Sequence, residues 1–161
     1  MTSTMFMSPS WAYAVRNALD AGPDNQALTE KLPEYWDFYH LVRAGYPSSW
    51  ALGARDLPEE LGGGVRYLLV AWGDNHVTEC RVLDESAPID ATYVLAADFH
   101  DWKALFEGYD ALRTVMYRKL LLEDGDLLEF FKAIYFFVES LALIAKVPTS
   151  FPADAKVPAP A

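Results

Sequence analysis

The chain has 161 residues, of which 52% are hydrophobic and 14% aromatic, and its formal net charge is −10. This length and composition predict one globular domain with a sizeable core. The negative charge argues against partners with phosphate backbones, so no nucleic acid is expected. The single cysteine, Cys80, excludes an intrachain disulfide framework, and it has no catalytic motif around it, so we expect an inert thiol. The first residues lack a secretory pattern, and we expect a cytoplasmic protein.

Capping signals place two helices in the N-terminal region. Ser8 can accept hydrogen bonds from free backbone amides, and Pro9 is tolerated in a first helical turn, so a helix is expected to begin here. Apolar residues then recur at helical spacing until Gly22, which ends the helix. Asp24 can cap a second, shorter helix that runs to residue 32, where Pro33 stops it.

The following segment carries weaker signals. Residues 35–42 (YWDFYHLV) are rich in aromatic side chains, which favours an extended strand. Residues 45–64 are expected to be irregular, with one helical turn within residues 57–61 and three glycines at residues 62–64. A glycine-rich loop that cradles phosphate should follow a strand and open a helix. Because these glycines precede a strand, we do not expect nucleotide binding.

Three strands are predicted in the middle of the chain. Residues 65–72 (VRYLLVAW) are apolar on both faces apart from Arg66, which is typical of a buried strand. Residues 76–83 and 91–97 form two further strands, and a turn signal at residues 73–75 separates the first two. Because consecutive strands with short connections pair antiparallel, we expect an antiparallel meander.

Beyond these strands the pattern becomes helical. Asp98 and Asp101 resemble a capping pair for a helix that ends at Gly108, and Asp110 can cap another helix. Residues 120–122, three leucines in a row, form a last short strand. The C-terminal half therefore predicts two short helices and one short strand before the longest apolar segment of the chain.

Residues 126–146 (DLLEFFKAIYFFVESLALIAK) are expected to form one long helix, which Asp126 caps. At about 100° per residue, its polar side chains fall within roughly a third of the circumference. They are Glu129, Lys132, Glu139, Ser140 and Lys146. The opposite, apolar side consists of Leu127, Phe130, Phe131, Ile134, Phe137, Val138 and Leu141. This apolar face is wider than an ordinary core requires, and charges in mid-helix argue against stable membrane insertion.

Side chains that could hold a metal or act as a base are few. Asp98, His100 and Asp101 offer metal-ligand atoms, but helix capping explains the two carboxylates better, and no metal is expected. Asp37 and His40 would pair on a helix, whereas on the predicted strand they point to opposite faces. The sequence therefore predicts no catalytic site.

Apolar side chains gather in the last third of the chain and come from several predicted elements. They are Trp102, Phe106, Tyr109, Met116, Phe130, Phe131, Ile134, Phe137, Val138 and Leu141. Two explanations stay open at this point. These residues either form a closed core with the sheet, or several of them line a cavity, because small-molecule sites are mostly apolar. No cofactor is expected in either case.

The order of motifs in the C-terminal half resembles the sterol carrier protein type 2 family of lipid-transfer domains. The family pattern runs from a sheet through a short helix to Met-x-Gly-Lys-Leu, a short strand, Gly-Asp and a long apolar helix. The corresponding segments here are residues 93–98, 102–110, 116–120 and 125–126. The resemblance implies an α/β (α+β) fold with a five-stranded, mostly antiparallel sheet covered by helices. It also implies no catalytic residues, and a hydrophobic tunnel between sheet and C-terminal helices that takes sterols, fatty acids or acyl-CoA.

One residue departs from this family pattern. Arg118 stands where the family has a glycine between methionine and lysine. Glycine allows backbone dihedral angles that other residues rarely adopt. We therefore expect the turn at Arg118, and with it the tunnel entrance, to be rebuilt in this chain.

Together these patterns predict a non-catalytic lipid-binding domain over residues 1–147, followed by a Pro/Ala-rich surface tail over residues 148–161. Its partner would be a hydrophobic small molecule. One alternative is an interaction module or homodimer, in which a partner chain covers the apolar helix face. Another is an enzyme acting on a hydrophobic substrate, with Asp37, His40 or Asp98 as base.

Overall fold

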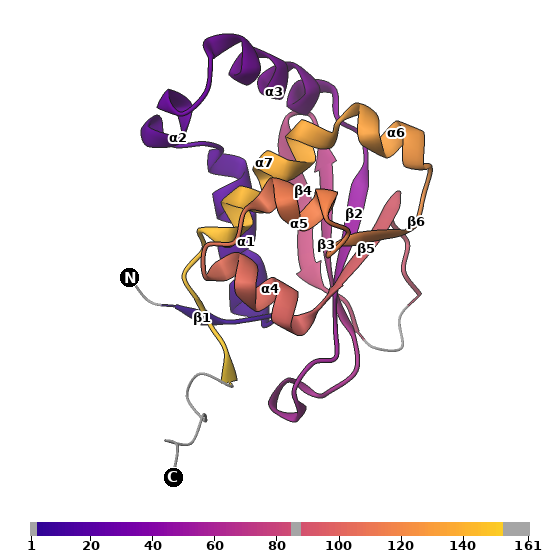
Figure 1. The fold of residues 1–161 in the computed structure, drawn as a ribbon. Helices are drawn as coiled ribbons and strands as arrows, with labels where there is room; N and C mark the ends of the chain where they lie inside the picture. Colours follow the sequence, from indigo (N-terminus) through magenta and orange to yellow (C-terminus); the bar gives the residue numbers. More distant parts are fainter. Residues whose placement is uncertain (1–2, 85–87, 153–161) are drawn as a thin grey trace.

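A five-stranded mixed sheet forms the centre of the molecule (Figure 1). The computed structural model describes residues 3–84 and 88–152. The strands, in the spatial order β4-β3-β2-β5-β6, are β2 (Ser49–Arg55), β3 (Arg66–Gly73), β4 (His76–Val82), β5 (Tyr93–Asp98) and β6 (Leu121–Asp124). Neighbouring strands pair antiparallel except β2 and β5, which are parallel. The expected fold, a mostly antiparallel five-stranded sheet with helices, is confirmed.

The predicted strands are confirmed as β3, β4, β5 and β6, but the predicted meander is wrong. β3 and β4 pair antiparallel, whereas β5 lies on the other side of β2. We missed β2 because its sequence, SWALGAR, is rich in small residues and contains a glycine, which strands rarely favour. Gly53 is required there, since a Cβ atom would lie 2.5 Å from Cε2 of Tyr67.

Two N-terminal helices follow their capping signals. α1 (Pro9–Ala21) begins after Ser8, whose hydroxyl accepts a hydrogen bond from the Trp11 amide. α2 (Asn25–Thr29) begins after Asp24, whose carboxylate accepts from the Ala27 amide, but it ends before the expected residue 32. Local side-chain chemistry therefore decided where both helices begin.

The aromatic segment 35–42 lies in a helix, so the predicted strand is wrong. α3 (Pro33–Gly45) includes the whole segment, and Pro33 begins this helix rather than ending the previous one. The buried residues Trp36, Tyr39 and Arg43 are spaced three and four apart, which is helical periodicity. The aromatic content of this segment favours a strand. The spacing of its buried residues is helical, and the segment forms a helix.

The elements between β2 and the C-terminal helices are as expected. A single turn of 3₁₀ helix, η1 (Glu59–Leu61), lies in the segment where one helical turn was predicted. α4 (Phe99–Phe106) and α5 (Ala111–Met116) confirm the two short helices. Asp110 caps α5 by accepting from the Arg113 amide, whereas Asp98 precedes α4 without a side-chain capping bond.

The predicted long helix consists of two helices. α6 (Leu127–Lys132) is capped by Asp126, as expected, and α7 (Ile134–Ala145) follows after Ala133. Ala133 has φ −115° and ψ 28°, outside the helical region, so the helical ladder is interrupted there. The apolar face predicted for one continuous helix is thereby divided between two helices.

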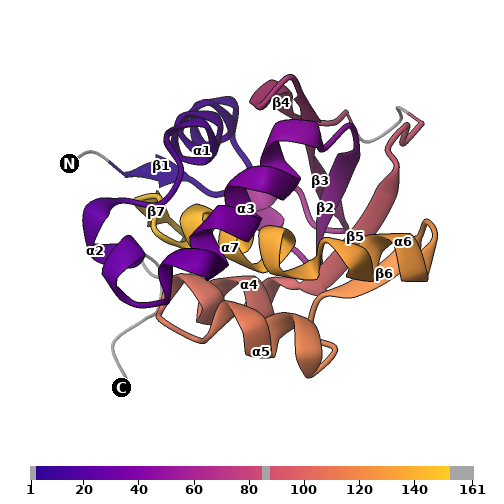
Figure 2. The same cartoon turned by 90° about the horizontal axis from the view of Figure 1, so that it is seen from above.

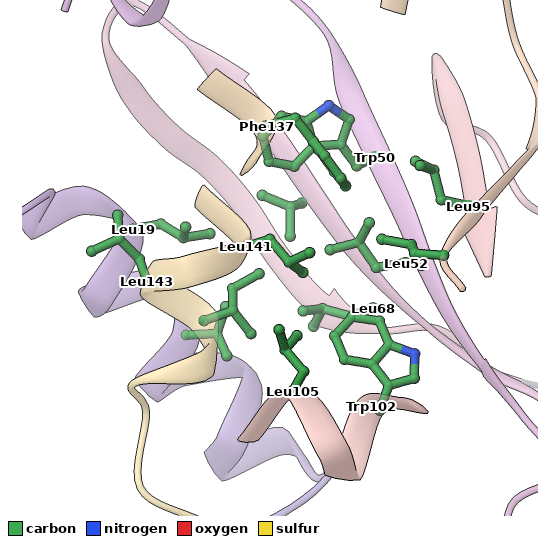
Figure 3. Packing of buried hydrophobic residues seen from close by; sticks show 14 of the residues in the cluster. Leu19, Trp50, Leu52, Leu68, Leu95, Trp102, Leu105, Phe137, Leu141 and Leu143 are labelled. Carbon is green, nitrogen blue, oxygen red and sulfur yellow. The ribbon is translucent and has the colours of Figure 1, made fainter. Parts of the chain in front are cut away.

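The helices gather on one side of the sheet, where α1 lies against β4 and α7 faces the central strands (Figures 1 and 2). Trp50 of β2 is fully buried, and the ring of Phe137 packs edge-on against it with the centroids 4.9 Å apart. Figure 3 shows this pair, with Leu141 of α7 directed toward Leu52 and Leu68 of the sheet. The main core therefore lies between α7 and the centre of the sheet.

The two ends of the described chain lie side by side. β1 (Thr4–Met5) and β7 (Thr149–Ser150) form a two-stranded parallel sheet. Phe151 is 5% exposed, and its ring packs against Phe6 at a centroid distance of 5.2 Å. Residues 149–151, which we assigned to a surface tail, are thus part of the fold, whereas residues 153–161 of that tail lie outside the described residues.

Candidate functional site

An apolar pocket lies between α5, β6 and α6, and it reaches β5 of the sheet. Its volume is about 400 Å³. Nine of its lining residues are apolar and the tenth is an arginine; they are Leu95, Val115, Met116, Arg118, Leu120, Leu121, Leu122, Leu127, Phe130 and Phe131. A volume of this size with a mostly apolar lining is typical of small-molecule sites.

This pocket has a buried floor and an exposed rim. Leu95 and Phe130 are almost fully buried, and the Phe130 ring packs edge-on against Tyr93 with the centroids 5.1 Å apart. At the rim, Met116, Leu127 and Phe131 are 46%, 54% and 42% exposed. An apolar molecule that entered the pocket would remove these large side chains from water, which is favourable.

Of the residues predicted to line a cavity, Met116, Phe130 and Phe131 lie together in this pocket. They come from α5 and α6, two helices that β6 connects. Phe130 and Phe131 are consecutive, so one reaches the floor while the other remains at the rim. The break after Lys132 lets α6 take its own direction and cover β6 rather than the centre of the sheet.

Four other predicted residues belong to the filled core. Trp102 donates a hydrogen bond from Nε1 to the Gly53 carbonyl oxygen over 2.8 Å, and it lines a gap with Leu141 that has no space for a water molecule. Phe137 packs against Trp50, and Ile134 is 8% exposed within the same core. For these positions the closed-core explanation is the one that the packing supports.

The remaining three lie apart from the pocket. Phe106 packs with Phe6 at a centroid distance of 6.0 Å, on the side of the termini. The Lys119 ammonium lies over the ring of Tyr109, 5.3 Å from its centroid. Val138 lines a separate, partly charged hollow of about 340 Å³ between α3, α5 and α7. The predicted set therefore divides among several places in the fold.

Most of the pocket lining was not among the predicted site residues. The missed residues are Leu95, Val115, Arg118, Leu120, Leu121, Leu122 and Leu127. Their elements were predicted, but a strand residue lines a pocket only if a helix leaves the adjacent space open. The three leucines of the predicted short strand follow Met116 four residues later in the chain. This run was the one local signal for an apolar surface there.

The polar stripe predicted for the last helix is wrong at two positions. Glu139 is 9% exposed, and its carboxylate accepts hydrogen bonds from Nζ of Lys31 and from the hydroxyl of Tyr35, each over 2.5 Å. Burial and the hydrogen bond to Glu139 raise the pKa of the Tyr35 phenol. Ser140 is fully buried and donates to the Phe136 carbonyl oxygen. Both polar groups find partners inside the protein, as buried polar groups usually do.

The acidic cluster at the start of α4 is paired with basic side chains. Asp98, His100 and Asp101 have ligand atoms within 4.8 Å of one another. Asp98 lies 3.3 Å from Arg55, and Asp101 lies 3.7 Å from Lys119. These ion pairs explain the two carboxylates without a bound cation.

Other candidate catalytic side chains are solvated or protonated. Asp37 and His40 lie on α3 rather than on a strand, and both are exposed. Burial raises the pKa of the Cys80 thiol from 9.0 to about 12, and its Sγ donates a hydrogen bond to the Ala12 carbonyl oxygen. A thiol that keeps its proton is a poor nucleophile, which agrees with the inert cysteine that we expected.

Within residues 3–84 and 88–152, no helix has both the length and the apolar character needed to span a bilayer. The most apolar helix, α7, has 12 residues, and about 20 are needed to span the hydrocarbon core.

The fold has close counterparts among solved structures. A crystal structure of sterol carrier protein 2 matches with a TM-score of 0.68 and 17% sequence identity, over 88% of this chain and 98% of that one. A solution structure from Thermus thermophilus, a conserved hypothetical protein described as possibly a sterol carrier protein, matches with a TM-score of 0.67 and 17% identity, over 92% and 94%. No protein-family model matches the sequence, and the search of curated proteins found no match. The chain thus has the fold of sterol carrier protein 2, reached through a sequence that shares few residues with it.

Proposed function

We propose that this protein binds an aliphatic ligand, a sterol, fatty acid or fatty acyl-CoA, without catalysis in the pocket between α5, β6 and α6. The observation that carries the proposal is the apolar pocket itself, about 400 Å³ with nine apolar lining residues. Transfer of each CH₂ group from water contributes about 0.8 kcal/mol, so a long alkyl chain binds usefully without further contacts. The structural likeness to proteins named as sterol carriers supports the same class of ligand.

Entry would involve movement of α6. This helix has six residues, Leu127 and Phe131 lie on the rim of the pocket, and Leu128 is 76% exposed. A short helix with so many exposed apolar side chains has less burial to hold it in place than α7. Displacement of α6 would widen the mouth, and it would break the edge-on contact between the rings of Phe130 and Phe137 of α7, whose centroids lie 5.0 Å apart.

Binding can be measured directly on the purified protein. Native mass spectrometry should detect a co-purified or added lipid at a ratio of one per chain, and an unlabelled fatty acid should displace a fluorescent one saturably. The absence of both a bound lipid and saturable displacement would reject the proposal.

Filling the pocket should abolish binding while the fold survives. Met116→Trp places a large ring at the rim, and Met116 is 46% exposed, so we expect little loss of stability but at least a roughly tenfold loss of affinity. Leu128→Trp is the matched control, since Leu128 is exposed on α6 but does not line the pocket. Equal affinities of the two variants would place the ligand elsewhere.

The alternative function is a homodimer that covers the exposed apolar side chains of α6. The exposure of Leu127, Leu128 and Phe131 is the observation that favours it. Light scattering coupled to size exclusion separates the two functions. A stable dimer that binds no lipid would support the alternative, whereas a monomer that binds lipid supports the pocket.

A further inference from the structure

One charged residue lines the otherwise apolar pocket. Arg118 follows α5 and is exposed, and the other nine lining residues are leucine, valine, methionine or phenylalanine. It stands in the chain between the exposed rim residue Met116 and the first strand residue Leu121. Its side chain therefore belongs to the mouth of the pocket, where the polar end of a bound amphiphile would remain.

The Arg118 guanidinium has no charged or hydrogen-bonding partner among residues 3–84 and 88–152. The next residue, Lys119, pairs with Asp101 at 3.7 Å, and Lys132 at the end of α6 pairs with Glu129 at 2.7 Å. An arginine presents several donors in a planar fork that matches carboxylate and phosphate oxygens.

The backbone at Arg118 adopts a conformation that favours glycine over arginine. Its φ is 62°, in the left-handed region, and its amide donates to the Val115 carbonyl oxygen just past the end of α5. Glycine is the residue that this helix-ending position favours, and an L-residue adopts the conformation at a cost. Residues held in such conformations cluster at functional sites. Arg118 thus adopts a left-handed conformation that a glycine would adopt more easily, and the expected rebuilding of the tunnel entrance stays a prediction.

We propose that Arg118 selects ligands with an anionic headgroup, a carboxylate or a phosphate, over neutral amphiphiles of the same chain length. This inference rests on the proposed lipid-binding function and adds a specificity-determining residue to it. The alkyl chain occupies the apolar pocket, and the headgroup stays at the mouth within reach of the guanidinium. The affinity then comes from burial of the alkyl chain and from one charge-assisted contact between the headgroup and the Arg118 guanidinium.

The test compares three ligands with one alkyl chain. Hexadecanoate, hexadecyl phosphate and hexadecanol are titrated at pH 8 against the wild-type protein, Arg118→Gln and Arg118→Gly. Wild type should bind at least one anion about tenfold more tightly than the alcohol. Both variants should lose about that factor for the anion and none for hexadecanol. The relative affinities of the two anions identify the headgroup, and the preference should weaken with added salt.

Two controls separate charge from folding. Arg113→Gln removes a positive charge from an exposed position of α5 outside the pocket lining, and it should leave all affinities unchanged. Arg118→Gly should also raise Tm, by about 2–4 °C, because glycine relieves the left-handed conformation. A weaker binding of anions by a more stable protein cannot come from unfolding.

Three results would overturn the inference. Equal wild-type affinities for the anions and the alcohol would show that the pocket mouth does not select for a charged headgroup. The lipid-binding function would then stand without the inference. Equal losses for all ligands in Arg118→Gln would make Arg118 a packing residue. Failure of wild type to bind any of the three would reject the lipid-binding function together with the inference.

Discussion

Burial decides the chemistry of Cys80. The residue lies in β4 against α1, where its thiol donates to the Ala12 carbonyl oxygen over 3.3 Å. Removal of the thiol from water disfavours the thiolate, and the pKa rises from 9.0 to about 12. The same effect raises the pKa of the Tyr46 phenol to about 12. These groups therefore act as packing side chains at physiological pH.

This shift predicts a loss of stability in alkaline solution. The unfolded chain releases the Cys80 proton from about pH 9, whereas the folded protein keeps it until about pH 12. The stabilisation is complete below pH 9 and is lost as the pH rises toward 12. Thermal unfolding followed by circular dichroism should show a shallower decline of Tm above pH 9 for Cys80→Ser than for wild type. Parallel curves would mean that the thiol does not contribute.

A partly buried ion pair connects the N-terminal helices to α7. Lys31 lies between α2 and α3, Tyr35 lies on α3, and both reach Glu139 of α7. The rings of Tyr35 and Tyr135 add an aromatic contact at a centroid distance of 6.0 Å. Because a buried carboxylate is costly without partners, this group helps to hold α3 against α7, together with the ring contact between Tyr39 and Phe136.

Removal of Glu139 should therefore cost stability. Glu139→Ala leaves the Tyr35 hydroxyl without its acceptor, and we expect a loss of about 1–3 kcal/mol in the free energy of unfolding. The contribution of Lys31 is small, because its side chain is 44% exposed. Glu129→Ala is the control, since its pair with Lys132 is exposed and should change stability by less than about 0.5 kcal/mol. Urea unfolding measures the free energy of unfolding of both variants. Similar losses for Glu139→Ala and Glu129→Ala would contradict the stabilising role of Glu139.

Across the whole molecule, a filled core and an open pocket lie next to each other along the C-terminal helices. α7 closes the centre of the sheet with Phe137 and Leu141 (Figure 3), whereas α6 and β6 enclose the pocket between them. The interruption at Ala133 separates the two roles. Stability and ligand binding should consequently depend on different residues of one apolar segment.

A single core truncation tests this division. Leu141→Ala should lower the free energy of unfolding by about 2–5 kcal/mol, because the Leu141 side chain is buried on the side of α7 that faces the sheet. The affinity of the folded fraction for lipid should remain that of wild type. Met116→Trp should show the reverse pattern, with stability kept and binding lost. A loss of affinity in Leu141→Ala that exceeds its unfolded fraction would place the ligand under α7 instead.

Local signals in the sequence determined much of this protein. Ser8, Asp24, Asp110 and Asp126 begin helices as predicted, because a cap depends on a side chain and the amides next to it. The continuous apolar pattern of residues 65–72 predicted a strand, and the order of motifs after it predicted the fold. These features need few distant contacts, so neighbouring residues in the chain are enough to predict them.

Only the tertiary structure decided which apolar residues face a pocket. The composition of α6 and α7 does not distinguish Phe131 at a rim from Phe137 in a core, since both are equally apolar and differ only in what packs against them. The place of β2, the burial of Glu139 and the gap beside β6 likewise depend on elements distant in the chain. Long-range packing thus determines which part of one apolar segment is left open to a ligand.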